Sequence, residues 1–183
     1  MRAFQVICAC VAVSFLLGSC GAAATALQDN FEQQIRGNLP GGSTSGSTTS
    51  PDPSRADVSI AQMLTLHNNL RSSKGLSKFT ADSTLSQIAQ RQAAYNASIN
   101  TISHADANGG QAWDRATAAG YDWTNIGENL AFSTNPQHIY NLWVNSPGHY
   151  HNMTNPVYTE IGIGKVIAGG GEYWCVVFAN PGS

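Results

Sequence analysis

EIGIGKVIAGGGEYWCVVFA, residues 160–179, is the stretch that decides the fold class of this chain. Its first half alternates Ile161 and Ile163 with glycines, which is the period of a strand that buries one face. A glycine-rich turn follows at residues 168–171, and the run from Tyr173 to Ala179 is almost continuously apolar, as in a strand buried on both faces. The stretch therefore predicts a β-hairpin inside a sheet.

Helical periodicity precedes this hairpin, with apolar residues recurring at three- and four-residue spacing. Four helices are expected. The first runs from an Asp57 cap to about Ser72–Gly75, and the second runs from a Thr80 cap through Asn96. The third runs from Gln111 to Ala119, before Gly120, and the fourth runs from Asn135-Pro136 to a stop at Ser146-Pro147-Gly148. A short strand is expected over Gly127–Phe132. The sequence thus predicts an α+β fold, a three-layer α-β-α sandwich with a small, mostly antiparallel central sheet.

The N-terminus has the pattern of a targeting segment. Arg2 precedes an apolar stretch of about 13 residues, which is too short to span a bilayer. We expect residues 1–26 to be a signal peptide and the mature protein to have no transmembrane helix. Two cleavage sites remain open: after Ala26, giving a secreted protein, or before Cys20, since Leu17-Gly18-Ser19-Cys20 resembles a lipobox and would give a cell-surface lipoprotein.

Residues 27–54 are expected to be a disordered linker, because the part from Gly37 to Ser54 is almost entirely Gly, Ser, Thr and Pro. The globular domain then covers residues 55–183. The net charge of −2, with only 11% charged residues, argues against nucleic-acid binding, which requires basic clusters. We expect an extracellular monomer.

Cysteine usage excludes a disulfide framework for the mature domain. Cys8, Cys10 and Cys20 lie in the leader, and Cys175 is the sole cysteine after it. Cys175 falls within the apolar run of the hairpin, so we expect a buried, unreactive thiol.

The candidate chemistry lies in histidines and one carboxylate. His104, His149 and His151 occur in loop-like, Gly- and Asn-rich surroundings, and Glu128 falls in a segment that is otherwise built to be buried. Such groups can form a divalent-metal site or a general acid–base pair, but spacing alone favours the alternative that His104 and Glu128 are hydrogen-bonded structural groups and that His151 is solvated. His67 adjoins the apolar stripe of the first helix and is interpreted as a core or boundary residue.

The order of motifs along the domain resembles the CAP superfamily, which includes cysteine-rich secretory, antigen 5 and pathogenesis-related proteins. The resemblance covers about Ala61–Pro181 and is strongest to bacterial SCP-like extracellular domains. It rests chiefly on two blocks, Gly127-Glu128-Asn129 and Trp143-Val144-Asn145-Ser146-Pro147-Gly148-His149 followed by Asn152.

The resemblance implies an α-β-α sandwich with a central polar cleft. Many family members line this cleft with two His and two acidic residues, sometimes around a divalent metal. Carried over by position, His104, Glu128 and His149 are the candidate metal-binding and catalytic residues, with zinc as the candidate ion. Ser146 stands where eukaryotic members have a second Glu, so Glu160 becomes a candidate for the fourth ligand.

Two functions remain open. The first is an extracellular binding or interaction module whose cleft holds a cell-wall component, a lipid or a protein. The alternative is a metal- or Glu-assisted hydrolase that uses the same cleft. The chain has neither a Gly-x-Ser-x-Gly nucleophile motif nor a His-Glu-x-x-His zinc motif, so we favour the binding module over an enzyme.

Overall fold

The computed structural model of this chain describes residues 58–135 and 137–182. The predictions for the signal peptide, Cys20, the 27–54 linker, Asp57 and Pro136 lie outside these residues. The described helices are α2 (Ile60–Ser73), α3 (Ser83–Ser98), α4 (Ala112–Ala118), α5 (Gln137–Val144) and α6 (Pro147–Thr154), and the strands are β1 (Thr80–Ala81), β2 (Trp123–Ser133), β3 (Glu160–Ala168) and β4 (Gly171–Pro181). None of the helices described is both long and apolar enough to cross a membrane.

The four strands form one sheet in the order β1-β3-β4-β2. The predicted hairpin is present as the antiparallel pair β3/β4, and β2 pairs antiparallel with the other edge of β4. The short strand β1, which the sequence analysis missed, pairs parallel with β3 and makes the sheet mixed. The α+β prediction with a mostly antiparallel sheet is confirmed.

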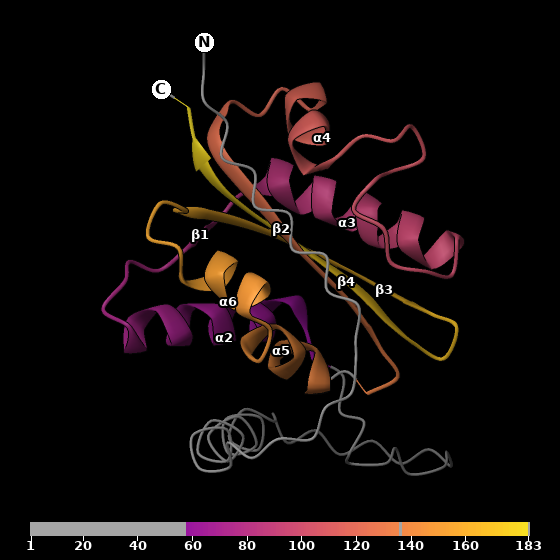
Figure 1. The fold of residues 1–183 in the computed structure, drawn as a ribbon, viewed down its shortest axis with the longest axis horizontal. Helices are drawn as coiled ribbons and strands as arrows, with labels where there is room; N and C mark the ends of the chain where they lie inside the picture. The colour runs from indigo at the N-terminus through magenta and orange to yellow at the C-terminus, as the bar shows by residue number, and fades with distance from the viewer. Residues whose placement is uncertain (1–57, 136, 183) are drawn as a thin grey trace, which may run out of the picture. The chain divides into compact units, whose positions relative to one another are not determined.

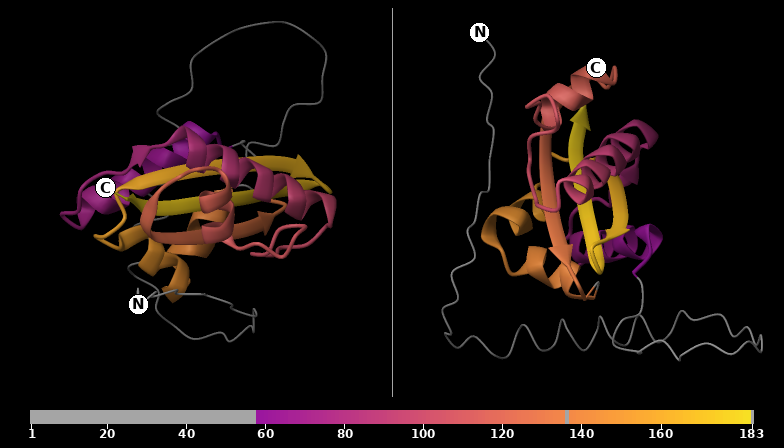
Figure 2. Two further views of the ribbon diagram at one scale, coloured as in Figure 1. Left: turned by 90° about the horizontal axis from the view of Figure 1, so that it is seen from above. Right: turned by 90° about the vertical axis from the view of Figure 1, so that its right-hand side faces the viewer.

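Helices cover both faces of the sheet, with α3 and α4 on one side and α2, α5 and α6 on the other (Figure 1). On the first side, Leu85 and Ile88 of α3 pack with Cys175 and Val177 of β4. On the second side, the ring of Phe178 packs against His67 of α2. Because β4 is buried by both helical layers, its apolar residues need no alternation with polar ones. Figure 2 shows the same arrangement from two further sides.

Helix α3 lies directly against strand β3, and two glycines make this possible. A Cβ atom at Gly162 would overlap the backbone of Leu85 and Ser86, and one at Gly164 would overlap the backbone of Ala89 and Gln90. The glycines that alternate with isoleucines in the sequence therefore form the helix-facing side of the strand.

The starts of three helices differ from the sequence prediction. The side chain of Asp82, and not of Thr80, caps α3, because Thr80 is taken into strand β1. The side chain of Ser59 caps α2 in a capping box with Gln62. Pro147 was interpreted as a stop, yet it stands in the first turn of α6, where its missing N–H has no helical partner to lose.

Candidate functional site

Glu128 lies at the centre of the candidate site, on strand β2 with only 8% of its surface exposed. Its Oε1 is 2.8 Å from His104 Nδ1, and its Oε2 accepts from the Arg115 guanidinium and, at 3.3 Å, from Cys175 Sγ. Both carboxylate oxygens are therefore engaged. A buried carboxylate requires such partners, and here they come from three separate elements or loops.

Arg115 reaches this carboxylate from α4. Besides the ion pair with Glu128, its Nη1 donates to the carbonyl oxygens of His104 at 2.9 Å and Gly110 at 2.8 Å. One guanidinium thus ties the loop between α3 and α4 to the edge strand β2. This contact fixes where His104 stands.

His104 is less enclosed than its partner. Its side chain is 25% exposed, whereas that of Glu128 is 4% exposed. Because Nδ1 faces Glu128, the hydrogen bond orients the ring and leaves Nε2 as the nitrogen available to other groups.

His149 is positioned by helix α6. Asn129 Nδ2 donates to the His149 carbonyl at 3.1 Å, and Asn152 Nδ2 donates to Asn129 Oδ1 at 2.9 Å, so the helix is anchored on β2 beside Glu128. The Nδ1 atom of His149 is buried and has no hydrogen-bond partner among the described residues. Burial, and secondly the charge of His104, lower the pKa of His149, so its imidazole is neutral at pH 7.

The structure brings His104 and Glu128 into direct contact, and the charge of His104 contributes to the lowered pKa of His149. His149 and His151 lie on helix α6, not in a loop as expected, and His151 is exposed. Glu160, the candidate fourth ligand, instead accepts from the Tyr121 hydroxyl at 2.6 Å.

The metal hypothesis remains a prediction. Within residues 58–135 and 137–182, no group of three or more His, Cys, Asp or Glu side chains is arranged to hold a metal ion. With both Glu128 oxygens engaged, one of them by a guanidinium, the donors left for an ion are imidazole nitrogens of His104 and His149. The carboxylate therefore fits the role of orienting a histidine better than that of a direct ligand.

Two partners of Glu128 were not recognised from the sequence. Cys175 was expected to be buried, and it is, but its contact with Glu128 depends on strand register: Glu128 pairs with Val177, which puts Cys175 diagonally opposite on the same face. Burial, then the Glu128 carboxylate, raise the pKa of the Cys175 thiol, in keeping with an unreactive group. Arg115 was not singled out among the candidate site residues, and its neighbour Asp114 makes it one of two charged residues in α4.

Comparison with known families gives a clear match. The model of the cysteine-rich secretory protein family, CAP, matches residues 64–178. The chain is 29% identical over 139 residues to the uncharacterized protein YkwD of Bacillus subtilis, a match covering 75% of this chain and 54% of YkwD. It is 30% identical over 109 residues to the uncharacterized membrane protein YlbC of the same organism, covering 58% of this chain and 31% of YlbC. The chain thus spans about half the length of the first of these relatives and less of the second.

Solved structures show the same fold. An extracellular protein of Bacillus anthracis that contains an SCP domain is similar with a TM-score of 0.60 at 24% identity, covering 66% of this chain and 39% of that one. An outer surface protein of Borrelia burgdorferi is similar with a TM-score of 0.63 at 22% identity, covering 67% of this chain and 92% of that one. At these identities the likeness concerns the fold alone.

Proposed function

Since this chain belongs to the cysteine-rich secretory protein (CAP) family, we propose that it acts outside the cell as a binding module whose ligand contacts His104 and His149. Two relatives of the same fold are described as an extracellular protein and an outer surface protein, which supports this location. The apolar leader at residues 6–18 is consistent with export.

The observation that carries the proposal is that His149 has a buried atom without a hydrogen-bond partner and a neutral ring. Its Nδ1 is buried without a partner among the described residues, and its lowered pKa keeps the ring neutral at pH 7. A neutral imidazole can donate or accept one hydrogen bond at this atom, depending on the tautomer. A polar ligand that reaches this atom, once the groups that cover it move aside, supplies the hydrogen bond that it lacks.

The engagement of Glu128 favours binding over hydrolysis. A general base must be able to take a proton from water or substrate at hydrogen-bond distance. Here His104, Arg115 and Cys175 already occupy both oxygens of the carboxylate. Glu128 therefore supports binding by holding His104 in place, and the hydrolase alternative would require this network to open.

The test compares His149→Ala with His151→Ala, a matched change at an exposed histidine of the same helix. Wild type and both variants are incubated with purified peptidoglycan, with phospholipid vesicles and with immobilised extracellular protein, and the bound fraction is measured. We expect wild type and His151→Ala to be retained on one of these probes and His149→Ala to be lost from it. Retention on none of them, or equal retention of His149→Ala, would contradict the proposal.

A further inference from the structure

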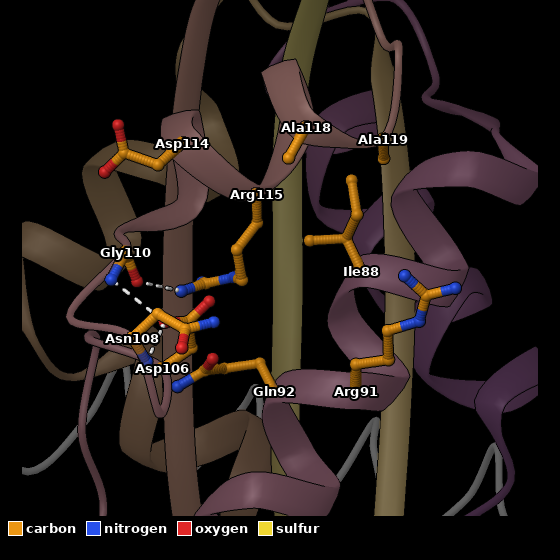
Figure 3. Close-up of a pocket in the computed structure, with 10 residues that line it drawn as sticks. All are labelled: Ile88, Arg91, Gln92, Asp106, Asn108, Gly110, Asp114, Arg115, Ala118 and Ala119. Atoms are coloured by element: carbon orange, nitrogen blue, oxygen red, sulfur yellow. Dashed lines mark hydrogen bonds between the residues drawn. The ribbon is translucent and has the colours of Figure 1, made fainter.

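The loop between α3 and α4 contains the sequence Asp106-Ala107-Asn108-Gly109-Gly110. Asn108 is the one asparagine of the chain that a glycine follows. Asn108 and Gly109 are both exposed, and Asn108 lines a surface pocket between this loop, α3 and α4 (Figure 3). Solvent therefore reaches the junction between these two residues.

An asparagine side chain can react with the backbone of the residue that follows it. The backbone nitrogen of that residue attacks the side-chain carbonyl carbon, the side-chain nitrogen leaves as ammonia with the backbone proton, and a succinimide ring forms. Water then opens the ring at either of its carbonyl groups, which gives aspartate or isoaspartate. A side chain on the following residue hinders the attack, and glycine has no side chain.

The structure leaves both reacting groups accessible. The side-chain amide of Asn108 has no hydrogen-bond partner among the described residues, so no contact holds it away from the backbone. Gly109 has a φ of +81°, and no atom lies within 4 Å of the position that a Cβ would take. Its N–H donates to the Asp106 carbonyl at 3.0 Å. This bond must open before the nitrogen attacks, and a single bond in an exposed turn opens at low free energy.

We propose that Asn108 is a site of spontaneous deamidation and that its isoaspartate product loosens the loop that carries His104. The reaction uses water as its co-reactant and releases ammonia, so it requires no enzyme or oxidant. The proposal goes beyond the binding function, because it assigns a covalent modification whose occurrence does not depend on whether the cleft binds a ligand.

Gly110 connects this turn to the candidate site. Its carbonyl accepts from Asp106 N at 2.9 Å and from Arg115 Nη1 at 2.8 Å, and the same Nη1 donates to the His104 carbonyl at 2.9 Å. Asp106 Oδ1 also accepts from the backbone nitrogens of Asn108 at 2.8 Å and Gly110 at 2.9 Å. Figure 3 shows how closely this turn and the Arg115 side chain are joined.

Isoaspartate would change the length of this turn. Its main chain runs through the side-chain carbons, which adds one backbone carbon between residues 108 and 109. Gly110 is then displaced relative to Asp106, and the bonds that close the turn across these two residues no longer fit. We expect Arg115 to lose its contact with the Gly110 carbonyl, so the loop before it becomes less constrained.

The first experiment measures the reaction in the folded full-length protein. The protein is incubated at pH 8 and 37 °C, and tandem mass spectrometry follows the gain in mass at each asparagine and separates isoaspartate from aspartate. We expect Asn108 to react at least about tenfold faster than Asn145, an exposed asparagine followed by Ser146, which corresponds to about 1.4 kcal/mol in activation free energy. If the two residues react equally slowly in the folded protein while the urea-unfolded chain reacts readily at Asn108, the turn protects this residue and the proposal is overturned.

The second experiment tests the effect on the loop by hydrogen exchange. Aged wild type is compared with fresh wild type and with equally aged Asn108→Gln, whose longer side chain keeps the amide but closes a ring much more slowly. We expect the peptide covering residues 103–110 to exchange faster in aged wild type alone, and unchanged exchange there would overturn the effect on His104.

A further variant separates the new charge from the longer backbone. Asn108→Asp carries the carboxylate of the deamidated protein on a main chain of normal length. We expect its loop to exchange hydrogen like that of fresh wild type. Exchange as fast as in the aged protein would overturn isoaspartate as the cause of the loosening.

Discussion

Glu128 illustrates what a single residue in a sequence can and cannot predict. A carboxylate in a segment built for burial predicts that partners exist, since an unpaired buried charge is too costly to keep. It cannot predict that Arg115 and Cys175 are among them. Those contacts depend on the register of β2 against β4 and on the position at which α4 packs. The sequence immediately around Glu128 predicts neither the register nor the position of the helix.

At His67 the structure predicts a pH dependence of stability. Its ring is fully buried against Tyr140, Trp143 and Phe178, and burial lowers its pKa to about 4. Between pH 6.5 and 4 the unfolded chain therefore binds a proton that the folded chain does not, so the free energy of unfolding falls as the pH falls. We expect this residue to account for about 2 kcal/mol of the loss between pH 7 and pH 5.

The measurement is urea denaturation at pH 7 and pH 5 for wild type and His67→Phe, which keeps an aromatic ring in an aromatic environment. Other acid-sensitive groups contribute equally to both proteins, so the difference isolates His67. A variant that loses as much stability as wild type would show that His67 does not stay neutral in the fold.

His149 is also where the zinc prediction is tested. Zinc binds only neutral imidazole, and burial lowers the pKa of His149, so any affinity that depends on His149 should hold at pH 7 and fall only at more acidic pH, where this ring takes up a proton. Calorimetric titration of zinc should show weaker binding to His149→Ala than to wild type or His151→Ala. Identical weak heats for all three proteins would remove the metal hypothesis.

At the scale of elements, strong periodicity was a reliable guide and weak periodicity was not. The hairpin and α3 were predicted because their apolar residues repeat with a clear period. Helix α6 was missed because its sequence, Pro147–Thr154, has few apolar residues and opens with Pro-Gly. Tertiary contacts stabilise it instead: Met153 is fully buried, and Asn152 donates to the Glu128 carbonyl at 3.3 Å.

The contact between α3 and β3 gives an element-scale prediction. Gly162→Ala would force a methyl group into the backbone of α3, which has no flexible atom to move aside. We expect the free energy of unfolding to fall by about 3 kcal/mol, the upper range for overpacking. Ile167→Thr, at a 65% exposed position of the same strand, should change it by less than about 0.5 kcal/mol. Equal stability of the two variants in urea denaturation would contradict the close approach of α3.

At the scale of the molecule, the candidate site exists because the fold assembles distant segments. Strand β2 provides Glu128, the loop between α3 and α4 provides His104, and α6 provides His149. Spacing along the chain could not show that these segments meet, and it was the resemblance to a family that grouped them. Arg115 belongs to one of the blocks that carry the resemblance, but it was not among the residues that the resemblance assigned to the site.

Truncation from the N-terminus gives a whole-molecule prediction. The composition of residues 27–54 predicts a linker without a core, so we expect its deletion to change the free energy of unfolding by less than about 0.5 kcal/mol. Extending the deletion through α2 should abolish folding. Arg71 of this helix is 1% exposed and donates to the carbonyls of Ser77, Met153, Asn155 and Tyr158. Deletion of α2 would leave these carbonyl groups without the guanidinium that satisfies them.

Calorimetric melting of wild type and both truncated chains measures the two effects separately. The shorter deletion should melt at the wild-type temperature, and the longer one should show no cooperative transition. The two deletions should differ because only the longer one removes the Arg71 guanidinium of α2. This group donates hydrogen bonds to the segment from Met153 to Tyr158, which leads into β3. A drop of many degrees on removing residues 27–54 alone would mean that this segment packs on the domain and is not a linker.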